Sequence, residues 1–463
     1  MDQQQVFDFI HDFNATWVGP ILSIILLFTG LYYTIRLRFV QRYFFLALRR
    51  LVGSGRKGKA SRSEGITPFQ ALSAAVASQV GTGNIVGVAT ALVAGGPGAL
   101  FWMWVSSILG MATNFSEAVL GQLYRTKRDN HAVGGPAFYI RNGLNSKFLA
   151  IVFAIFGILS LGLMGVMVQS NSIVDSVASF FPTGVNKLYI GIPLALLIFS
   201  VLAGGVTRIV AFAERVVPFM ATLFVVGALV FIGMHIDGVP GVFRDIFKYA
   251  FTPYAAGGGA MGIVVMQSIR YGISRGLFSN EAGLGSTPHA HAIAQVKHPY
   301  DQGLVALLGV GTTFIICTLS GLVILLSGVI QTHPDAQGVA IAQTAFRGAF
   351  GAGGKYFIGL ALFFFAFTTS VGWYFFAAQN MRYLCGNRLI WPLRVAVALV
   401  VVLSSVVQVD LVWEMADTFN FFLVIPNVIA LLLLSPQVVR EANRLHKEVR
   451  DGQNVAPDAG EDA

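Results

Sequence analysis

The sequence predicts an all-α membrane protein of eleven transmembrane helices, in which one extra N-terminal helix precedes two groups of five. Hydrophobic residues make up 55% of the 463 residues and charged residues only 11%, whereas average soluble domains carry about 25% charged residues. Apolar windows of about twenty residues or more, long enough to cross a bilayer, recur along the chain. Two of these windows are interrupted at corresponding places, which predicts the two related groups.

The first predicted span covers residues 17–36. The preceding stretch, Met1 to Asn14, contains no Lys or Arg, so it lacks the basic start of a signal peptide. Nine Lys and Arg residues then occur between Arg36 and Arg62. Because cytoplasmic loops are enriched in basic residues, this distribution predicts a cytoplasmic first loop and an N-terminus on the outside.

Ten further windows complete the predicted set and place the C-terminus in the cytoplasm. The basic residues agree, since 24 of the 31 Lys and Arg fall in segments predicted to be cytoplasmic and five in segments predicted to lie outside. Such a chain belongs in a plasma membrane, which is the inner membrane in a bacterium. The later spans are residues 67–93, 98–123, 149–178, 186–204, 209–235, 258–290, 303–330, 353–384, 387–408 and 411–436.

The spans divide the chain into four predicted parts. The net charge of +9 arises from cytoplasmic loops, which argues for the lipid bilayer and against nucleic acid as a partner. The two cysteines lie in apolar segments, which excludes a disulfide framework. The parts are an N-terminal helix with its basic loop (1–66), the first group of five (67–235), the second, inverted group (258–436) and a cytoplasmic tail (437–463).

The window 67–93 is interrupted near its middle by Gly81, Thr82 and Gly83, where helix propensity is poorest. A broken helix is tolerated in lipid only where its freed amides and carbonyls face protein, water or a ligand. The break therefore predicts a binding site. The alternative is that the glycines let a neighbouring helix approach closely.

The window 258–290 carries Arg275, Asn280 and Glu281, which are costly in a membrane and indicate a functional site or buried pairing. An offset of 196 residues overlays Ser78 on Ser274 and Asn84 on Asn280. Because the offset covers five spans, the two groups would be inverted repeats. Paired interrupted helices of this kind mark the central site of transporters with the leucine-transporter fold.

Several motifs resemble the alanine/glycine:cation symporter family, over roughly residues 10–450. The resemblance implies the leucine-transporter fold with one extra N-terminal helix, and sodium-coupled uptake of a small amino acid, typically alanine or glycine. The motifs are GTGNIVGVATA (81–91), GGPGALFWMW (95–104), GGPAFYI (134–140), RGLFSNEAGLGS (275–286), AHA (290–292) and PN (426–427).

The candidate substrate site follows from the chemistry of a zwitterion. Amides at the first break can bind a carboxylate at a half-helix N-terminus, and carbonyls at the second break, predicted near Ile273 to Phe278, would hold the ammonium. Bulky rings of Phe278 and Trp373 would restrict the pocket to small side chains. Asn84 and Asn171 are further polar candidates. For Gln169 and Asn171 the alternative is ordinary hydrogen bonding between helices. The predicted substrate residues are Gln79, Gly81, Thr82, Gly83, Gln169, Ile273, Gly276, Phe278 and Trp373.

A sodium site is predicted on the window 353–384. Helical spacing brings the hydroxyls of Thr368 and Thr369 near the Phe365 carbonyl, and an oxygen-only cluster suits a hard cation. The resemblance adds the carbonyls of Ala77 and Val80. The alternative is that both threonines hydrogen-bond to their own helix. The predicted sodium residues are Ala77, Val80, Asn84, Phe365, Thr368 and Thr369.

The coupling ion depends on titratable groups. The predicted cation cluster contains no carboxylate, which favours sodium, while Glu117 and Glu281 keep proton coupling open. We expect Glu281 to pair with Arg275 or Arg270. His289 and His291, with His298, provide no closed metal-ligand set.

The sequence thus predicts a secondary active symporter that works by alternating access and needs no cofactor besides Na⁺. A proton-coupled symporter on the same fold is the main alternative. No charged ring or repeated filter segment indicates a channel. No nucleophile, base and acid set indicates an enzyme.

Overall fold

The structure is a computed structural model that describes residues 3–53, 65–128, 131–181, 183–253, 265–334, 336 and 338–452. These residues are almost entirely helical, apart from a two-stranded antiparallel hairpin of β1 (Thr126–Arg128) and β2 (His131–Val133). Six helical stretches in the described part are long and apolar enough to cross a membrane. They are Gln4–Arg36, Lys147–Ala178, Gly205–Met234, Pro299–Ser327, Ala352–Cys385 and Val409–Leu433.

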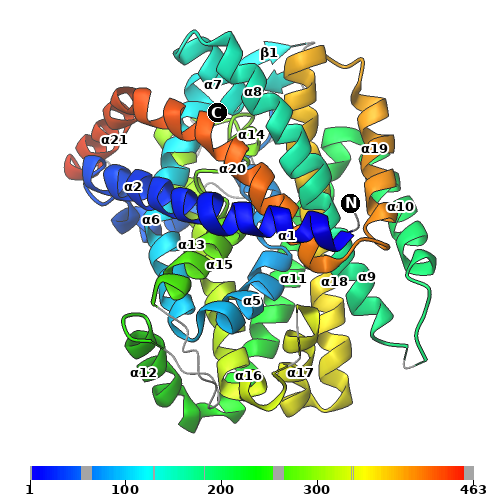
Figure 1. Ribbon diagram of the computed structural model, residues 1–463. Coiled ribbons are helices and arrows are strands. Elements are labelled where there is room, and N and C mark those ends of the chain that lie inside the picture. The colour runs from blue at the N-terminus through cyan, green and yellow to red at the C-terminus, as the bar shows by residue number, and fades with distance from the viewer. Residues whose placement is uncertain are drawn as a thin grey trace, which may run out of the picture.

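The first of these stretches begins earlier than predicted. Helix α1 (Gln3–Phe13) continues through a π turn, η1 (Asn14–Val18), into α2 (Gly19–Arg36). Figure 1 shows α1 and α2 as one long helix across the front of the bundle. A 3-10 turn, η2 (Val40–Tyr43), and α3 (Phe44–Gly53) follow.

The predicted interruption of the second window is confirmed. Helix α4 (Pro68–Gln79) starts with a capping box in which Thr67 and Gln70 satisfy each other's backbone amides. It ends before Gly81, whose backbone is extended (φ −131°, ψ −154°). After a 3-10 turn, η3 (Thr82–Asn84), the chain resumes as α5 (Val86–Gly95). Two half-helices therefore replace one continuous span.

Most helices up to residue 249 follow the predicted windows closely, but the helices at 136–143 and 239–249 lie between windows. Helix α6 (Gly98–Leu123) matches its window at both ends, and the window 149–178 corresponds to α8, a π turn and α9. The elements are α6, β1, β2, α7 (Pro136–Gly143), α8 (Lys147–Gly157), η4 (Ile158–Gly165), α9 (Val166–Ala178), α10 (Leu188–Ala203), α11 (Gly205–Met234), η5 (Ile236–Gly238) and α12 (Val239–Tyr249).

The second interruption lies later than predicted. Helix α13 (Val265–Asn280) runs unbroken through Ile273 to Phe278, so the prediction of a break there is wrong. The helix ends at Asn280, and the next residue, Glu281, adopts a left-handed conformation (φ 57°). Gly283 and Gly285 also have positive φ. A short helix, α14 (Pro288–His291), follows. Helix α13 stays regular because its glycines pack closely against α6 and polar partners on other helices compensate for the side chains that suggested a break, as Asp417 does for Arg275.

The remaining long apolar helices again follow the predicted windows, but the helices at 339–350 and 435–450 lie outside them. The elements are α15 (Pro299–Ser327), α16 (Val329–Thr332), α17 (Val339–Phe350), α18 (Ala352–Cys385), α19 (Ile390–Leu403), α20 (Val409–Leu433) and α21 (Ser435–Arg450). The last residues of the predicted tail, 453–463, lie outside the described part.

Two helices organise the packing. Helix α6 lies against α2, α13 and α15, and α18 lies against α4, α9, α11 and α17. In Figure 1, α7 and the β hairpin occupy the upper end of the bundle, and α12, α16 and α17 occupy the lower end. The break between α4 and α5 is buried between these two groups, where it contacts α13 and α18.

Candidate functional site

The two interrupted segments meet in the interior. The side chain of Gln79, the last residue of α4, donates a hydrogen bond of 2.8 Å to the carbonyl of Asn280, the last residue of α13. Both residues are buried. Two helix ends, each with unpaired backbone groups of its own, are therefore joined directly, although they lie 201 residues apart in the chain.

The amides at the first break face side-chain oxygens. The Gly81 amide donates to Asn84 Oδ1 at 2.9 Å, and the Thr82 amide donates to Gln169 Oε1 at 2.9 Å. Gln169 comes from α9, so the structure brings it to the predicted site. These two amides point at acceptors, which is the geometry that an anion at a half-helix N-terminus requires.

The Asn84 side chain connects the break in α4 to neighbouring helices. Its Nδ2 donates to Ser279 Oγ at 2.7 Å and contacts Cys317 Sγ at 3.4 Å. The side chain therefore links the break to α13 and α15, and no bond recorded among the described residues joins it to Thr369. Its predicted place among the sodium residues has no direct geometric support here.

Three oxygens of the predicted cation cluster converge. The Thr369 hydroxyl lies 3.0 Å from the Ala77 carbonyl and 3.2 Å from the Val80 carbonyl. Both carbonyls are at the end of α4, where the helix no longer provides amide donors for all of them. A methyl group at Gly81 would lie 2.5 Å from the same hydroxyl oxygen, so only glycine fits beside it.

Thr368 behaves differently from Thr369. Its hydroxyl donates to carbonyls of its own helix, at 2.9 Å from Phe364 and 3.0 Å from Phe365, and lies 3.4 Å from Met220 Sδ. The alternative of back-bonding thus applies to Thr368, which stays close to the Phe365 carbonyl as predicted. It does not apply to Thr369, which reaches across to α4.

Aromatic rings enclose the break on its other side. The ring of Phe278 lies edge-on to Trp373, with centroids 5.5 Å apart, and 4.7 Å from Trp413. A methyl group at Gly83 would approach Phe278 Cδ1 to 2.8 Å. The predicted aromatic wall is therefore assembled against the glycines, and Trp413 of α20 also belongs to it.

The expected pairing of Glu281 with Arg275 or Arg270 is wrong. Arg275 forms a two-pronged ion pair with Asp417 of α20, at 3.0 and 3.2 Å. Asp417 is not among the residues predicted from the sequence, although an acidic residue inside a predicted span by itself indicates a buried partner. Arg275 turns toward α20 because its guanidinium also lies over the Trp413 ring, 4.8 Å from the ring centroid.

Glu281 accepts hydrogen bonds from three uncharged donors instead. The Trp373 indole donates at 2.5 Å, the Ser78 hydroxyl lies at 3.1 Å, and the Ser286 hydroxyl also donates. The carboxylate is fully buried. It ties α4, α18 and the non-helical segment after α13 together at one point.

Glu117 of α6 is a second buried carboxylate, and it contacts the same segment. Its Oε1 accepts from the Gly285 amide at 3.0 Å and from Asn427 Nδ2 at 2.7 Å, and Asn427 also donates to the Gly283 carbonyl. Its Oε2 has no hydrogen-bond partner among the described residues. No group of three or more potential metal ligands from His, Cys, Asp and Glu occurs in the described part of the chain.

Three predicted candidates lie away from the break. A methyl group at Gly276 would meet the Ser106 side chain at 2.9 Å, so this glycine faces α6. Ile273 is buried within the regular part of α13, where its carbonyl belongs to the helix. Asn171 donates to the carbonyls of Ser404 and Val407 at 2.8 and 3.2 Å, which is ordinary bonding between helices.

Comparison with known proteins gives this geometry a context. The model of the sodium:alanine symporter family matches residues 3–459. The chain is 39% identical to the sodium/alanine symporter AgcS of Methanococcus maripaludis, over 96% of this chain and 98% of that protein. It is 39% identical to the amino-acid carrier protein AlsT of Bacillus subtilis, over 93% and 90% of the two chains.

A solved structure shares the fold. A mutant of the manganese transporter of Eremococcus coleocola is similar with a TM-score of 0.56 at 15% identity, over 81% of this chain and 80% of that one. At this identity the similarity concerns the fold alone. The chain is a multi-pass, mostly helical membrane transporter, not an enzyme, and it belongs to the sodium:alanine symporter family.

Proposed function

We propose that the protein is a symporter that couples the entry of sodium to the uptake of a small neutral amino acid, alanine or glycine. The observation that carries the proposal is the convergence of the Thr369 hydroxyl on the carbonyls of Ala77 and Val80 at a broken helix. Neutral oxygens of this kind suit sodium. The relatives AgcS and GlnT, the latter a probable sodium/glutamine symporter of Bacillus subtilis at 38% identity, carry names that refer to sodium.

The substrate carboxylate would bind the amides of Gly81 and Thr82, in place of the side-chain oxygens of Asn84 and Gln169. Charge-assisted hydrogen bonds to an anion are stronger than hydrogen bonds to a neutral amide oxygen. A carboxylate can therefore displace the two side-chain oxygens from the amides. Gln79 and Gly83 would border the same position. Phe278 and Trp373 would limit the side chain of the substrate, which supports alanine or glycine over a larger residue.

The ammonium group would lie toward the end of α13. The last four carbonyls of a helix have no partner within it, and the negative end of the helix dipole favours a cation. The carbonyls of Phe278 and Ser279 belong to this last turn. This position replaces the predicted one around Ile273 and Gly276, which lie away from the break.

We place the break within a fold of eleven spans with two inverted groups of five, in which the two groups rock around the central site. The N-terminus would lie outside and the C-terminus in the cytoplasm. One sodium ion is sufficient for accumulation. A potential of about 100 mV and a tenfold sodium gradient together supply about 3.7 kcal/mol, which corresponds to roughly 500-fold accumulation.

Uptake into proteoliposomes tests the proposal. Radiolabelled alanine should accumulate when an inward sodium gradient is imposed, and should not when potassium replaces sodium at the same pH. Uptake of alanine that needs no sodium would overturn the proposal. A panel of unlabelled amino acids as competitors then ranks glycine, alanine and glutamine.

Proton coupling on the same fold is the second candidate. It is favoured by the two buried carboxylates, Glu117 and Glu281, neither of which forms an ion pair among the described residues. Accumulation driven by an inward proton gradient in sodium-free buffer supports this candidate and excludes strict sodium coupling.

A further inference from the structure

The C-terminal helix α21 lies along the surface directly after the last long apolar helix, α20. Only Leu434 separates the two helices. One face of α21 is buried, with Val438, Ala442 and Leu445 packed into the core. In Figure 1, α21 lies at the left edge of the molecule, beside the end of α2.

Polar contacts hold α21 in this position along its whole length. Near its start, Ser435 bonds to Tyr32 and Gln437 to Tyr124, at 2.8 and 2.7 Å. Near its end, Glu448 forms an ion pair with Arg50 at 2.8 Å. Because helices from the rest of the bundle hold both ends, the outward face of α21 has a defined geometry.

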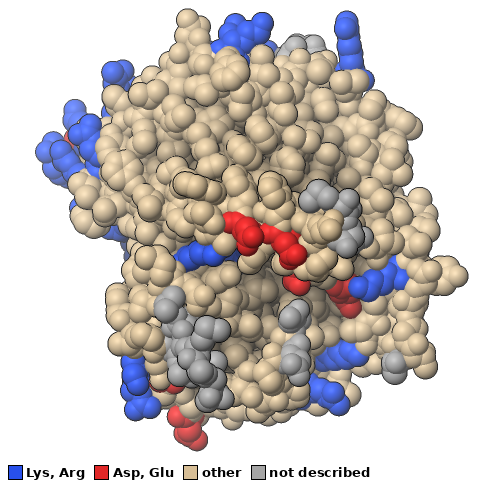
Figure 2. Space-filling model, in the orientation of Figure 1, with Lys and Arg blue, Asp and Glu red and all other residues tan. Residues whose placement is uncertain are grey.

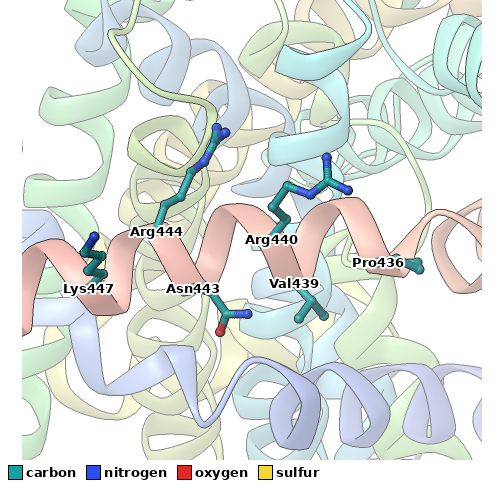
Figure 3. A pocket seen from close by; sticks show the side chains of 6 residues that line it. All are labelled: Pro436, Val439, Arg440, Asn443, Arg444 and Lys447. Carbon is teal, nitrogen blue, oxygen red and sulfur yellow. The ribbon is translucent and has the colours of Figure 1, made fainter.

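The outward face carries a hollow between basic side chains. It has a volume of about 490 Å³ and is open to the surroundings. In Figure 3, the three basic side chains extend from one edge of α21, and those of Val439 and Asn443 from the other. The hollow is lined by Pro436, Val439, Arg440, Asn443, Arg444 and Lys447.

The positive charge of this face is largely uncompensated. Arg444 pairs with the buried Glu441 at 2.5 Å, and Glu448 is already paired with Arg50. Neither Arg440 nor Lys447 forms an ion pair with any part of the chain that the structure describes. Figure 2 shows blue side chains gathered at the left edge of the molecule, where Figure 1 places α21.

We propose that the outward face of α21 binds the phosphate of an anionic phospholipid from the leaflet that borders this end of the molecule. The helix starts where α20 leaves the apolar region, so its first turns lie at headgroup depth. Basic residues next to a membrane span attract anionic lipids. Pro436 and Val439 give the hollow an apolar edge that suits the glycerol and upper acyl chain of a lipid and that free phosphate does not need.

Lipid nanodiscs test this proposal on the full-length protein. We compare wild type with the double variant Arg440→Gln/Lys447→Gln in discs of phosphatidylcholine alone and with one fifth phosphatidylglycerol. Native mass spectrometry counts the phosphatidylglycerol molecules that stay bound, and thermal unfolding reports stabilisation. Wild type should retain phosphatidylglycerol and unfold at a higher temperature in its presence. The double variant should bind it roughly 30-fold more weakly, as expected for the loss of two basic contacts.

A matched control removes two exposed basic residues from the other end of the molecule. Arg244 on α12 and Arg347 on α17 are exposed, and Arg244→Gln/Arg347→Gln should bind phosphatidylglycerol like wild type. The variant Asn443→Glu tests the hollow independently, since it keeps every cation and adds a repelling charge. It should lose the lipid, whereas Asn443→Gln should retain it.

Three results would overturn the proposal. Equal retention of phosphatidylglycerol by Arg440→Gln/Lys447→Gln and wild type would show that α21 does not bind this lipid. An equal loss in Arg244→Gln/Arg347→Gln would show only a general effect of charge. Stabilisation by 10 mM inorganic phosphate (about the concentration of a phosphate buffer) that equals that of the lipid would make this a free-anion site. None of these readouts involves substrate or sodium, so the result is independent of the proposed transport function.

Discussion

The indole Nε1 of Trp373 donates a hydrogen bond of 2.5 Å to Oε1 of Glu281. The two residues come from α18 and from the segment that follows α13, so the bond joins two elements that both border the break in α4. Gly165 leaves room for the indole, since a methyl group there would overlap the ring of Trp373. The Trp373 ring is therefore held in one orientation by a buried acceptor and a glycine.

We expect Glu281 to set the size of the substrate pocket through Trp373. Glu281→Gly removes the acceptor and suits the positive φ of this position, so the indole should lose its fixed orientation. The preference for alanine over leucine in uptake should then fall about tenfold, in line with the loss of one bond to a charged group. Glu281→Gln keeps an acceptor and should retain the preference. An unchanged preference in Glu281→Gly would contradict this role.

Sodium dependence should respond to Thr369 more than to Thr368. Thr369→Val removes the hydroxyl that faces Ala77 and Val80 and nearly preserves the side-chain shape. The sodium concentration for half-maximal uptake should rise by at least about tenfold, as expected for a lost polar contact to a cation. Thr368→Val, whose hydroxyl bonds to its own helix, should change it less. Sodium titrations of alanine uptake measure both, and the reverse order would place the ion elsewhere.

Asn84 provides a separate test of the predicted sodium set. Asn84→Ala removes the contacts to the Gly81 amide and to Ser279. We expect weaker uptake, with protein that still reaches the membrane. Because Asn84 organises the break, the apparent affinity for alanine should fall as well as that for sodium. A change confined to sodium would instead support direct contact with the ion.

Substitution by alanine should have different effects at two glycines near the first break, Gly81 and Gly87. A methyl group at Gly81 would lie 2.5 Å from Thr369 Oγ1 and 2.8 Å from Gln169 Oε1. Such overlap costs about 1–3 kcal/mol, so Gly81→Ala should weaken uptake by roughly 5- to 150-fold. At Gly87 the nearest atoms are 3.9 and 4.0 Å away, so Gly87→Ala should transport normally. Uptake and membrane yield are measured together, and normal uptake by Gly81→Ala would show that the site lies elsewhere.

Protonation of His446 in mild acid should weaken the packing of α21 against the rest of the protein. Burial, together with the nearby charge of Arg42, lowers the pKa of His446 below its ordinary value of about 6.5. The unfolded chain therefore binds more protons than the folded one in mild acid. The stabilisation is fully present above about pH 6.5 and is lost as the pH falls below it. Between pH 7.5 and 5.5 the Tm of wild type should fall more than that of His446→Gln, and equal falls would exclude this origin.

Most of the helix framework could be predicted from the sequence because apolar length and glycine placement act locally. Gly98 and Leu123 bound both the predicted span and α6, and the break at Gly81 follows from poor helix propensity. The end of α13 could not be predicted this way. Its polar residues looked like an interruption, and packing against α6 keeps them helical up to Asn280.

The sequence by itself determined the membrane class, the broken helix at Gly81 and the residue types from which a cation cluster can be built. Only the tertiary structure decided which of them meet. Arg275 pairs with Asp417, 142 residues away, and Glu281 is left to orient Trp373. Thr369 reaches α4, whereas Thr368, its neighbour in sequence, bonds to its own helix. Residue type and spacing specify what a side chain can bind, but the approach of distant helices determines which partner lies within hydrogen-bond distance.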